Sequence, residues 1–189
     1  MGLPRPDVLL TLVTAAGFSG WHALNDRIMG GSSSGDCTAG PPGLAFQGVL
    51  VAEGGGFISC RSPLFSPPLD LSDHAGLALE ITGDGRRFKL AVGCADGLAG
   101  ITELIPGGLR WVHEFGTEPE GITLVRIPFA SLRPSVRAQP LGIPLLRFDP
   151  TRVNRLQLLH SRFGDDGQPN AGFRAGAIAF TLHAIRAYP

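Results

Sequence analysis

The segment from residue 76 to residue 94 restricts the fold of this chain more than any other stretch. Apolar and other residues alternate through Gly76–Thr82, and the alternation resumes over residues 86–94. Asp84-Gly85 lies between them and is a dipeptide that favours the tight turn of a β-hairpin. Alternation on both sides of such a turn predicts two paired antiparallel strands, each with one buried face. The predicted buried residues are Leu77, Leu79, Ile81, Phe88, Leu90 and Val92.

Several other segments alternate in the same way or are bounded by turn residues. We expect strands at 44–53, 57–61, 101–105, 109–115, 122–127, 153–160 and 173–185. The glycines at 54–56 predict a hairpin between the first two. Residues 30–43 and 133–150 are rich in glycine, serine or proline and are expected to form loops. No long window has helical periodicity with caps, so the pattern predicts an all-β sandwich or barrel.

Length and composition indicate one globular domain over residues 1–189. We expect its core at 17–189, with residues 1–16 as a lead-in strand or short helix. The apolar run 8–16 loosely resembles the core of a signal peptide, but the prolines and aspartate before it do not fit one. The run is also too short to span a bilayer, which needs about 20 apolar residues.

Charge and motif content argue against several functional classes. Sixteen basic and sixteen acidic residues give no net charge, whereas nucleic-acid binders usually carry a basic excess. The three cysteines lack metal-ligand spacing and are expected as reduced thiols, and the five histidines form no metal-binding pair. Serine-hydrolase and phosphate-loop motifs are missing from the sequence. We therefore expect no catalytic residue, metal or cofactor, although carboxylate spacing neither supports nor excludes a glycosidase pair.

The most distinctive stretch is WHALNDRIMGGSSS at residues 21–34. Its short polar side chains, glycines and free backbone N–H groups could accept a ligand, a cation or a partner backbone. The alternative is a self-contained loop in which Asn25 and Asp26 bond nearby amides. A set of arginines could line one face of the domain, or could be solvated strand-exterior charges. The set comprises Arg61, Arg86, Arg87, Arg126 and Arg137.

Four segments in order resemble the complex I intermediate-associated protein family. They are 21–35, 46–61, 83–90 and 124–137. The family signatures correspond to Trp21, Asn25, Asp26, Met29, Gly30, Gly31 and Ser33, then Gly55, Gly56, Phe57 and Arg61. Phe88 replaces the usual tyrosine and so lacks its hydroxyl. Arg137-Ala138 replaces an Arg-Gly pair, which puts a turn with positive φ at that point in doubt.

The resemblance implies a galactose-binding-domain-like jelly-roll β-sandwich of a standalone, cyanobacterial type. It implies a non-enzymatic assembly factor or chaperone that binds protein subunits during biogenesis of a membrane-bound respiratory or photosynthetic complex. The expected location is cytoplasmic, with peripheral association to the thylakoid or inner membrane. Two other classes stay open: a carbohydrate- or small-ligand-binding module, and an RNA-associated biogenesis factor.

The resemblance also selects candidate binding residues. They are Trp21, Asn25, Asp26, Met29, Gly30, Gly31, Ser33 and Arg61. We expect Trp21 to anchor the loop at the sandwich edge and Arg61 to pair with Asp26. On this interpretation, Asp26→Ala impairs function more than stability.

Overall fold

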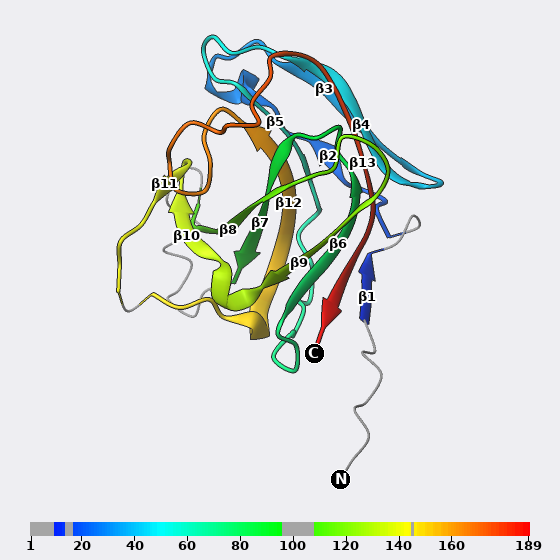
Figure 1. Cartoon of the computed structure of the whole chain (residues 1–189). Coiled ribbons are helices and arrows are strands. Elements are labelled where there is room, and N and C mark those ends of the chain that lie inside the picture. Colours follow the sequence, from blue (N-terminus) through cyan, green and yellow to red (C-terminus); the bar gives the residue numbers. More distant parts are fainter. Residues whose placement is uncertain (1–9, 14–16, 96–107, 145) are drawn as a thin grey trace.

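The computed structural model describes residues 10–13, 17–95, 108–144 and 146–189. The described chain forms two antiparallel sheets stacked as a sandwich (Figure 1). This confirms the all-β jelly-roll prediction. Among these residues the helices are single 3-10 turns, and none is long and apolar enough to cross a membrane.

One sheet has six strands and the other has seven. The six-stranded sheet runs in the order β3-β4-β13-β6-β9, with β1 also paired to β13. Its strands are β1 (Leu10–Val13), β3 (Ser34–Gly40), β4 (Gly43–Leu50), β6 (Gly76–Thr82), β9 (Thr123–Pro128) and β13 (Gly176–Tyr188). The seven-stranded sheet runs in the order β11-β10-β8-β7-β12-β5-β2. Its strands are β2 (His22–Ala23), β5 (Phe57–Arg61), β7 (Arg87–Cys94), β8 (Arg110–Gly116), β10 (Arg133–Val136), β11 (Gln139–Pro140) and β12 (Val153–Ser161).

The core lies between the two sheets and is built by side chains of one parity on each strand. The predicted buried set on β6 and β7 is confirmed, since all six side chains are at most 1% exposed. Phe88 meets Phe180 edge-on across the sandwich, with ring centroids 5.2 Å apart. Phe180 in turn stacks on Phe46 at 5.2 Å. Aromatic contacts of this kind add to the hydrophobic stabilisation of the interior.

The two predicted hairpins are wrong in their pairing, although their strands are right. β6 pairs with β13 and β9, whereas β7 pairs with β12 and β8. Asp84-Gly85 does form a left-handed turn, with φ of 60° and 70°, but that turn carries the chain from one sheet to the other. Likewise, β4 belongs to the six-stranded sheet and β5 to the seven-stranded sheet, so they do not pair with each other. In each case the apolar faces meet across the core instead of lying side by side.

Two predicted loops contain strands. Residues 30–43 include β3, which pairs with β4 along its whole length. Gly35 and Gly48 face each other there, and a Cβ on Gly48 would lie 2.2 Å from the Ser34 carbonyl oxygen, so the close approach requires glycine. Residues 133–150 include the edge strands β10 and β11.

The turn between β10 and β11 resolves the doubt raised by Ala138. Arg137 and Ala138 have φ of 49° and 62°, so the left-handed turn forms without glycine. This conformation costs roughly 1–2 kcal/mol for a residue with a Cβ, so the edge of the seven-stranded sheet carries local strain.

Near the start of the chain, Leu10–Val13 forms a strand within the segment predicted as a lead-in strand or short helix. The rest of that predicted segment and the predicted strand at 101–105 lie outside the described residues. The 3-10 turns are η1 (Asp26–Met29), η2 (Phe129–Ser131) and η3 (Pro150–Arg152).

The strand β13 organises the six-stranded sheet. Its first half pairs with β4 and its second half with β1, while β6 runs along its other side. In Figure 1 it crosses the middle of that sheet. A segment late in the sequence therefore joins strands formed much earlier.

Candidate functional site

A groove of about 700 Å³ lies on the outer face of the seven-stranded sheet. Its floor consists of strand residues whose side chains point away from the core, because they alternate with the buried apolar set. The register places Arg61 beside Gln157, Gln157 beside Ala91, and Ala91 beside Val112. These residues of β5, β12, β7 and β8 form one row across this concave surface. We call the surface the groove.

One end of the groove is bordered by the predicted binding loop. Asp26 begins the turn η1 and is fully buried. Its Oδ1 accepts the Ser33 backbone N–H at 2.9 Å, and its Oδ2 accepts the Ser33 hydroxyl and the Gly56 backbone N–H, both at 2.7 Å. Phe57 adds a longer contact of 3.4 Å from its backbone N–H. The carboxylate thus holds together the loop before β3 and the start of β5.

Asn25 makes a second connection between the sheets. Its Nδ2 donates to the Gly35 carbonyl on β3 at 3.0 Å, and its Oδ1 accepts the Ser59 backbone N–H on β5 at 3.4 Å. We refer to Asn25, Asp26, Ser33 and their backbone partners as the Asp26 cluster. Burial raises the pKa of Asp26, but the hydrogen bonds from Ser33, Gly56 and Phe57 outweigh it and hold that pKa below the ordinary value of 3.8.

Glycines enclose the carboxylate on both sides. A Cβ on Gly31 would lie 2.3 Å from Asp26 Cγ, and one on Gly55 would lie 2.6 Å from Asp26 Cβ. Neither position has a positive φ, so the close contact with Asp26, and not the backbone conformation, is what excludes a side chain there. Gly30 differs, because its φ is 87° and no atom lies within 4 Å of a Cβ placed on it.

The same turn presents two apolar side chains to solvent. Ile28 is 65% exposed and Met29 is 64% exposed, and both line the groove. Of the eight large hydrophobic side chains that are exposed among the described residues, four line it: Ile28, Met29, Leu64 and Phe163. Exposed apolar side chains gathered on one concave surface are typical of interaction sites.

The groove is also rich in cations. Six basic residues line it, namely Arg61, Lys89, Arg110, Arg137, Arg155 and Arg162, whereas Asp165 is the one carboxylate among its described lining residues. Burial lowers the pKa of Arg61, and the positive charges of Arg155 and Arg110 lower it further. Arg155 and Arg110 therefore lie close enough to Arg61 to repel it.

Lys89 on β7 also lines the groove. Its Nζ donates to the Phe163 carbonyl at 2.6 Å and contacts the Gly164 carbonyl at 3.4 Å. Burial lowers the pKa of Lys89 to about 8, although Glu114, Asp165 and Asp166 act in the opposite direction.

On the core side of the same sheet, His160 of β12 is fully buried. Its Nδ1 contacts the Arg87 carbonyl at 2.6 Å, so this nitrogen carries the proton. The ring stacks on Phe173 at 5.7 Å. Burial lowers the pKa of His160 to about 4, so the imidazole is neutral at physiological pH.

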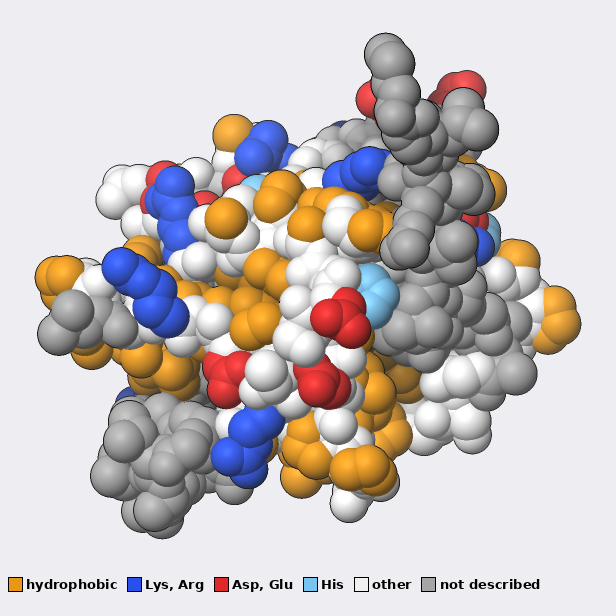
Figure 2. Space-filling model, turned by 90° about the horizontal axis from the view of Figure 1, so that it is seen from below, with side chains coloured by type: hydrophobic (Ala, Val, Ile, Leu, Met, Phe, Trp, Pro, Cys, Tyr) orange, Lys and Arg blue, Asp and Glu red, His pale blue; other side chains and the backbone are white. Residues whose placement is uncertain are grey.

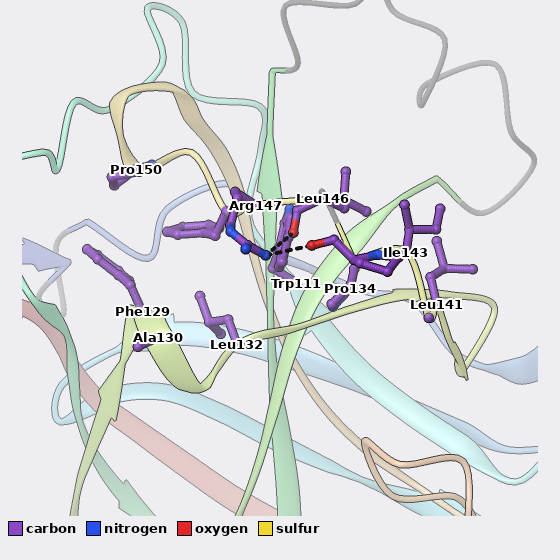
Figure 3. Close-up of a pocket in the computed structure, with 13 residues that line it drawn as sticks. Trp111, Phe129, Ala130, Leu132, Pro134, Leu141, Ile143, Leu146, Arg147 and Pro150 are labelled. Carbon is purple, nitrogen blue, oxygen red and sulfur yellow. Dashed lines mark hydrogen bonds between the residues drawn. The ribbon is translucent and has the colours of Figure 1, made fainter.

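In a second cavity, of about 680 Å³, the lining side chains are apolar except for that of Arg147 (Figure 3). Trp111, Phe129 and Phe148 supply its aromatic side chains, and Trp111 meets Phe148 edge-on at 5.7 Å. The guanidinium of Arg147 is directed at the Pro144 carbonyl, at 2.9 Å. Seen from below, the molecule has hydrophobic side chains gathered near the middle of its surface, with charges of both signs between them (Figure 2).

The structure brings most of the predicted binding residues together, but with different exposures. Trp21 is 7% exposed and packs edge-on against Phe18, as an anchor would. Asp26 and Ser33 are fully buried, whereas Met29 is exposed. The predicted Arg61–Asp26 ion pair is wrong: the described partners of the Asp26 carboxylate are Ser33, Gly56 and Phe57.

The arginines predicted as a possible common face are separated. Arg61 and Arg137 line the groove. Arg86 is buried and donates to the Ala177 carbonyl at 2.8 Å, and Arg87 pairs with Glu114 at 2.6 Å. Arg126 lies over the Tyr188 ring on the other sheet.

Sequence reasoning missed Ile28, Arg110 and Arg155 as groove residues. The alternation along β12 predicts that Arg155 faces outward, because its neighbours of the other parity, Leu156 and Leu158, point inward. Among the described residues, no group of three or more His, Cys, Asp or Glu could hold a metal ion. The three cysteines carry free thiols.

Comparison with known proteins gives a family match over nearly the whole chain. The model of the family described as "Complex I intermediate-associated protein 30 (CIA30)" matches residues 11–182. No curated protein sequence matches significantly.

Solved structures add likeness of fold. The family 11 carbohydrate-binding module of the cellulase Lic26A-Cel5E from Clostridium thermocellum has a TM-score of 0.62 at 14% identity, covering 98% of this chain and 97% of that one. The same type of module in complex with a β-1,3-1,4-mixed-linked tetrasaccharide has a TM-score of 0.58 at 17% identity, covering 95% and 94%. The agarase AgWH50C has a TM-score of 0.55 at 8% identity, covering 96% of this chain but 25% of the enzyme. At these identities the likeness concerns the fold alone.

Proposed function

The chain belongs to the complex I intermediate-associated protein 30 family, and on this premise we propose that it is a non-enzymatic assembly factor that binds a protein partner through the groove. The partner is a subunit of a membrane-bound respiratory or photosynthetic complex during its biogenesis. Such a role places the chain in the cytoplasm, peripheral to the inner or thylakoid membrane.

One observation carries this proposal. In the segment that carries the first family signature, Asp26 and Ser33 are fully buried, while Met29 of the same signature is 64% exposed and lines the groove. Ile28 stands beside it with 65% exposure. Burying two such side chains in an interface would stabilise a complex by about 1.5–3 kcal/mol each before the costs of association.

The test is co-purification of the tagged chain from membranes of the source organism. Wild type should retain subunits of one complex, and the double variant Ile28→Ser/Met29→Ser should lose them. Leu124→Ser is the matched control, since Leu124 is 76% exposed on β9 of the other sheet. Both variants should melt close to wild type, because the altered side chains are exposed.

Two results would contradict the proposal. One is full retention of the partner by the Ile28/Met29 variant. The other is the absence of any retained subunit in repeated experiments, together with a deletion strain whose membrane complexes all assemble normally.

The likeness of fold to sugar-binding modules favours a second candidate, a carbohydrate-binding module. Such modules commonly stack sugar rings on exposed aromatic platforms. The aromatic residues lining the described groove are Phe57 and Phe163, and neither tryptophan nor tyrosine contributes. Saturable binding of a mixed-linked β-glucan tetrasaccharide, competed by the protein partner, would favour this candidate over the first.

A further inference from the structure

The middle of the groove has an unusually low floor. Ala91 of β7 lines it between Lys89 and Cys94, and Val112 of β8 lies beside Ala91. Gly93 lies beside Arg155 in the register, and a Cβ on Gly93 would lie 3.2 Å from Arg155 Cβ. Small side chains at the centre therefore leave space between the longer side chains at the sides.

Arginines occupy the positions around this floor. Arg61 comes from β5, Arg155 from β12 and Arg110 from β8, and we call these three the arginine cluster. The chain as a whole carries equal numbers of basic and acidic residues, but six basic residues and one carboxylate line the described groove. The surplus of positive charge is thus a local property of this surface.

Within the described residues, the side chain of Arg61 is not fully satisfied. Its Nε is buried and has no hydrogen-bond partner among the described residues. Its charged neighbours are Arg155 and Arg110, which repel it. A buried donor without a partner destabilises the protein by about 1–3 kcal/mol, and an arriving anion would relieve the repulsion between the guanidinium groups.

We propose that the arginine cluster binds carboxylates of an acidic, extended segment of the partner protein. This inference rests on the proposed function and specifies the chemistry of the partner. Arginine suits the task, since its planar guanidinium donates two parallel hydrogen bonds to one carboxylate. The apolar residues Ile28, Met29 and Leu64 border the same groove, so the segment combines acidic with apolar side chains.

Other anionic partners fit the groove less well. Single-stranded RNA is generally held by bases stacked on aromatic side chains, and the described lining offers two phenylalanines. A flat bilayer surface does not reach the floor of a recessed groove. A peptide strand fits both the shape and the mixture of charged and apolar contacts.

The experiment uses the purified full chain and a fluorescent peptide of alternating glutamate and leucine. Fluorescence anisotropy should detect binding at low salt that weakens as salt is raised, because screening reduces charge attraction. A peptide with glutamine in place of glutamate is the matched ligand control and should bind at least about tenfold more weakly.

Variants of the chain locate the interaction. Arg61→Gln should weaken binding of the glutamate peptide about tenfold, and Arg61→Lys should restore part of the loss. Arg152→Gln is the matched control and should leave binding unchanged, because Arg152 is exposed on η3 and lies outside the groove. In wild type, NMR should show the Arg61 Nε–Hε resonance shifting on addition of the peptide, which keeps the test valid if a variant unfolds.

Three outcomes overturn the inference: equal binding of the glutamate and glutamine peptides, a peptide-induced shift confined to residues outside the groove, or tighter binding of a poly(U) RNA than of the glutamate peptide. If the glutamate peptide does not bind but the membrane co-purification succeeds and depends on Ile28 and Met29, the proposed function stands and this inference fails. If the co-purification fails while the peptide binds as described, the arginine cluster binds acidic peptides, but the proposed function in assembling a membrane complex fails.

Discussion

The Asp26 cluster and the arginine cluster are both polar and both border the groove, but their side chains are bonded in opposite ways. Each oxygen of the Asp26 carboxylate accepts hydrogen bonds from the protein itself. Arg61 has a buried donor without a partner among the described residues, and its charged neighbours repel it. A polar group satisfied within the fold stabilises it, whereas one left unsatisfied is available to a ligand. The difference indicates that the buried polar residues around Asp26 stabilise the fold, whereas Arg61 has the unsatisfied donor that the proposed recognition requires.

The largest expected effect comes from removing the Asp26 carboxylate. Asp26→Ala leaves the Ser33 and Gly56 donors unsatisfied in a buried position, so we expect a loss of about 3–5 kcal/mol in the free energy of unfolding. Chemical denaturation measures it. This reverses the sequence-based expectation that Asp26→Ala affects function more than stability. A stable Asp26→Ala protein that has lost its partner would restore the earlier interpretation and break the comparison.

The glycines beside the carboxylate sharpen the comparison. Gly55→Ala forces a Cβ against Asp26 and should destabilise the domain by about 3 kcal/mol. Gly30→Ala meets no atom within 4 Å, so only its positive φ opposes the change, at a cost of about 1 kcal/mol. Thermal unfolding of the two variants side by side checks the order. Equal effects would show that packing around Asp26 is looser than described.

A pH titration tests a third buried group, His160, which lies under the sheet that carries the groove. Its pKa is about 4 in the folded protein and about 6.5 when exposed. Between these values the unfolded chain binds a proton that the folded protein excludes, so stability is complete above pH 6.5 and falls as the pH drops toward 4. We expect a loss of about 1–3 kcal/mol across this window.

The control for that titration is His160→Leu, which should remove the dependence on pH in the same window while lowering stability at pH 7. Denaturation midpoints measured between pH 4 and 7 supply the data. If the stability of His160→Leu falls as steeply with decreasing pH as that of wild type, another group causes the pH dependence.

The smallest expected effect is on the rim of the groove. Met29→Ser should change the free energy of unfolding by no more than about 0.5 kcal/mol, because Met29 is 64% exposed. Chemical denaturation of Met29→Ser and Gly55→Ala under the same conditions compares an exposed residue of the first family signature with an enclosed glycine of the second. A loss above 2 kcal/mol would mean that Met29 belongs with the structural residues.

The sequence was sufficient to predict which residues of β6 and β7 face the core, because burial on one side imposes a period of two. It was not sufficient to predict which strands pair. Two strands with one apolar face each can lie side by side or face each other across a sandwich, and a turn such as Asp84-Gly85 serves both arrangements. Strand order depends on contacts between distant segments, which local patterns do not record.

The same limit applies to the candidate site. The signature around Asp26 is visible because short polar residues and glycines cluster within ten positions. Arg61, Arg110 and Arg155 come from three separate strands and become neighbours only through the strand order. The β3 strand was missed for a different reason, since its glycines and small residues have low strand propensity and pairing with β4 decides its conformation.

The position of β13 has a consequence for synthesis on the ribosome. β4 and β6 emerge early, yet each must wait for Gly176–Tyr188 before its inner edge is covered. Until then the nascent chain exposes two strand edges that invite pairing with other chains. Nascent chains stalled before residue 176 should therefore be sensitive to protease and recruit holding chaperones, and resistance should appear in one step once β13 has left the exit tunnel.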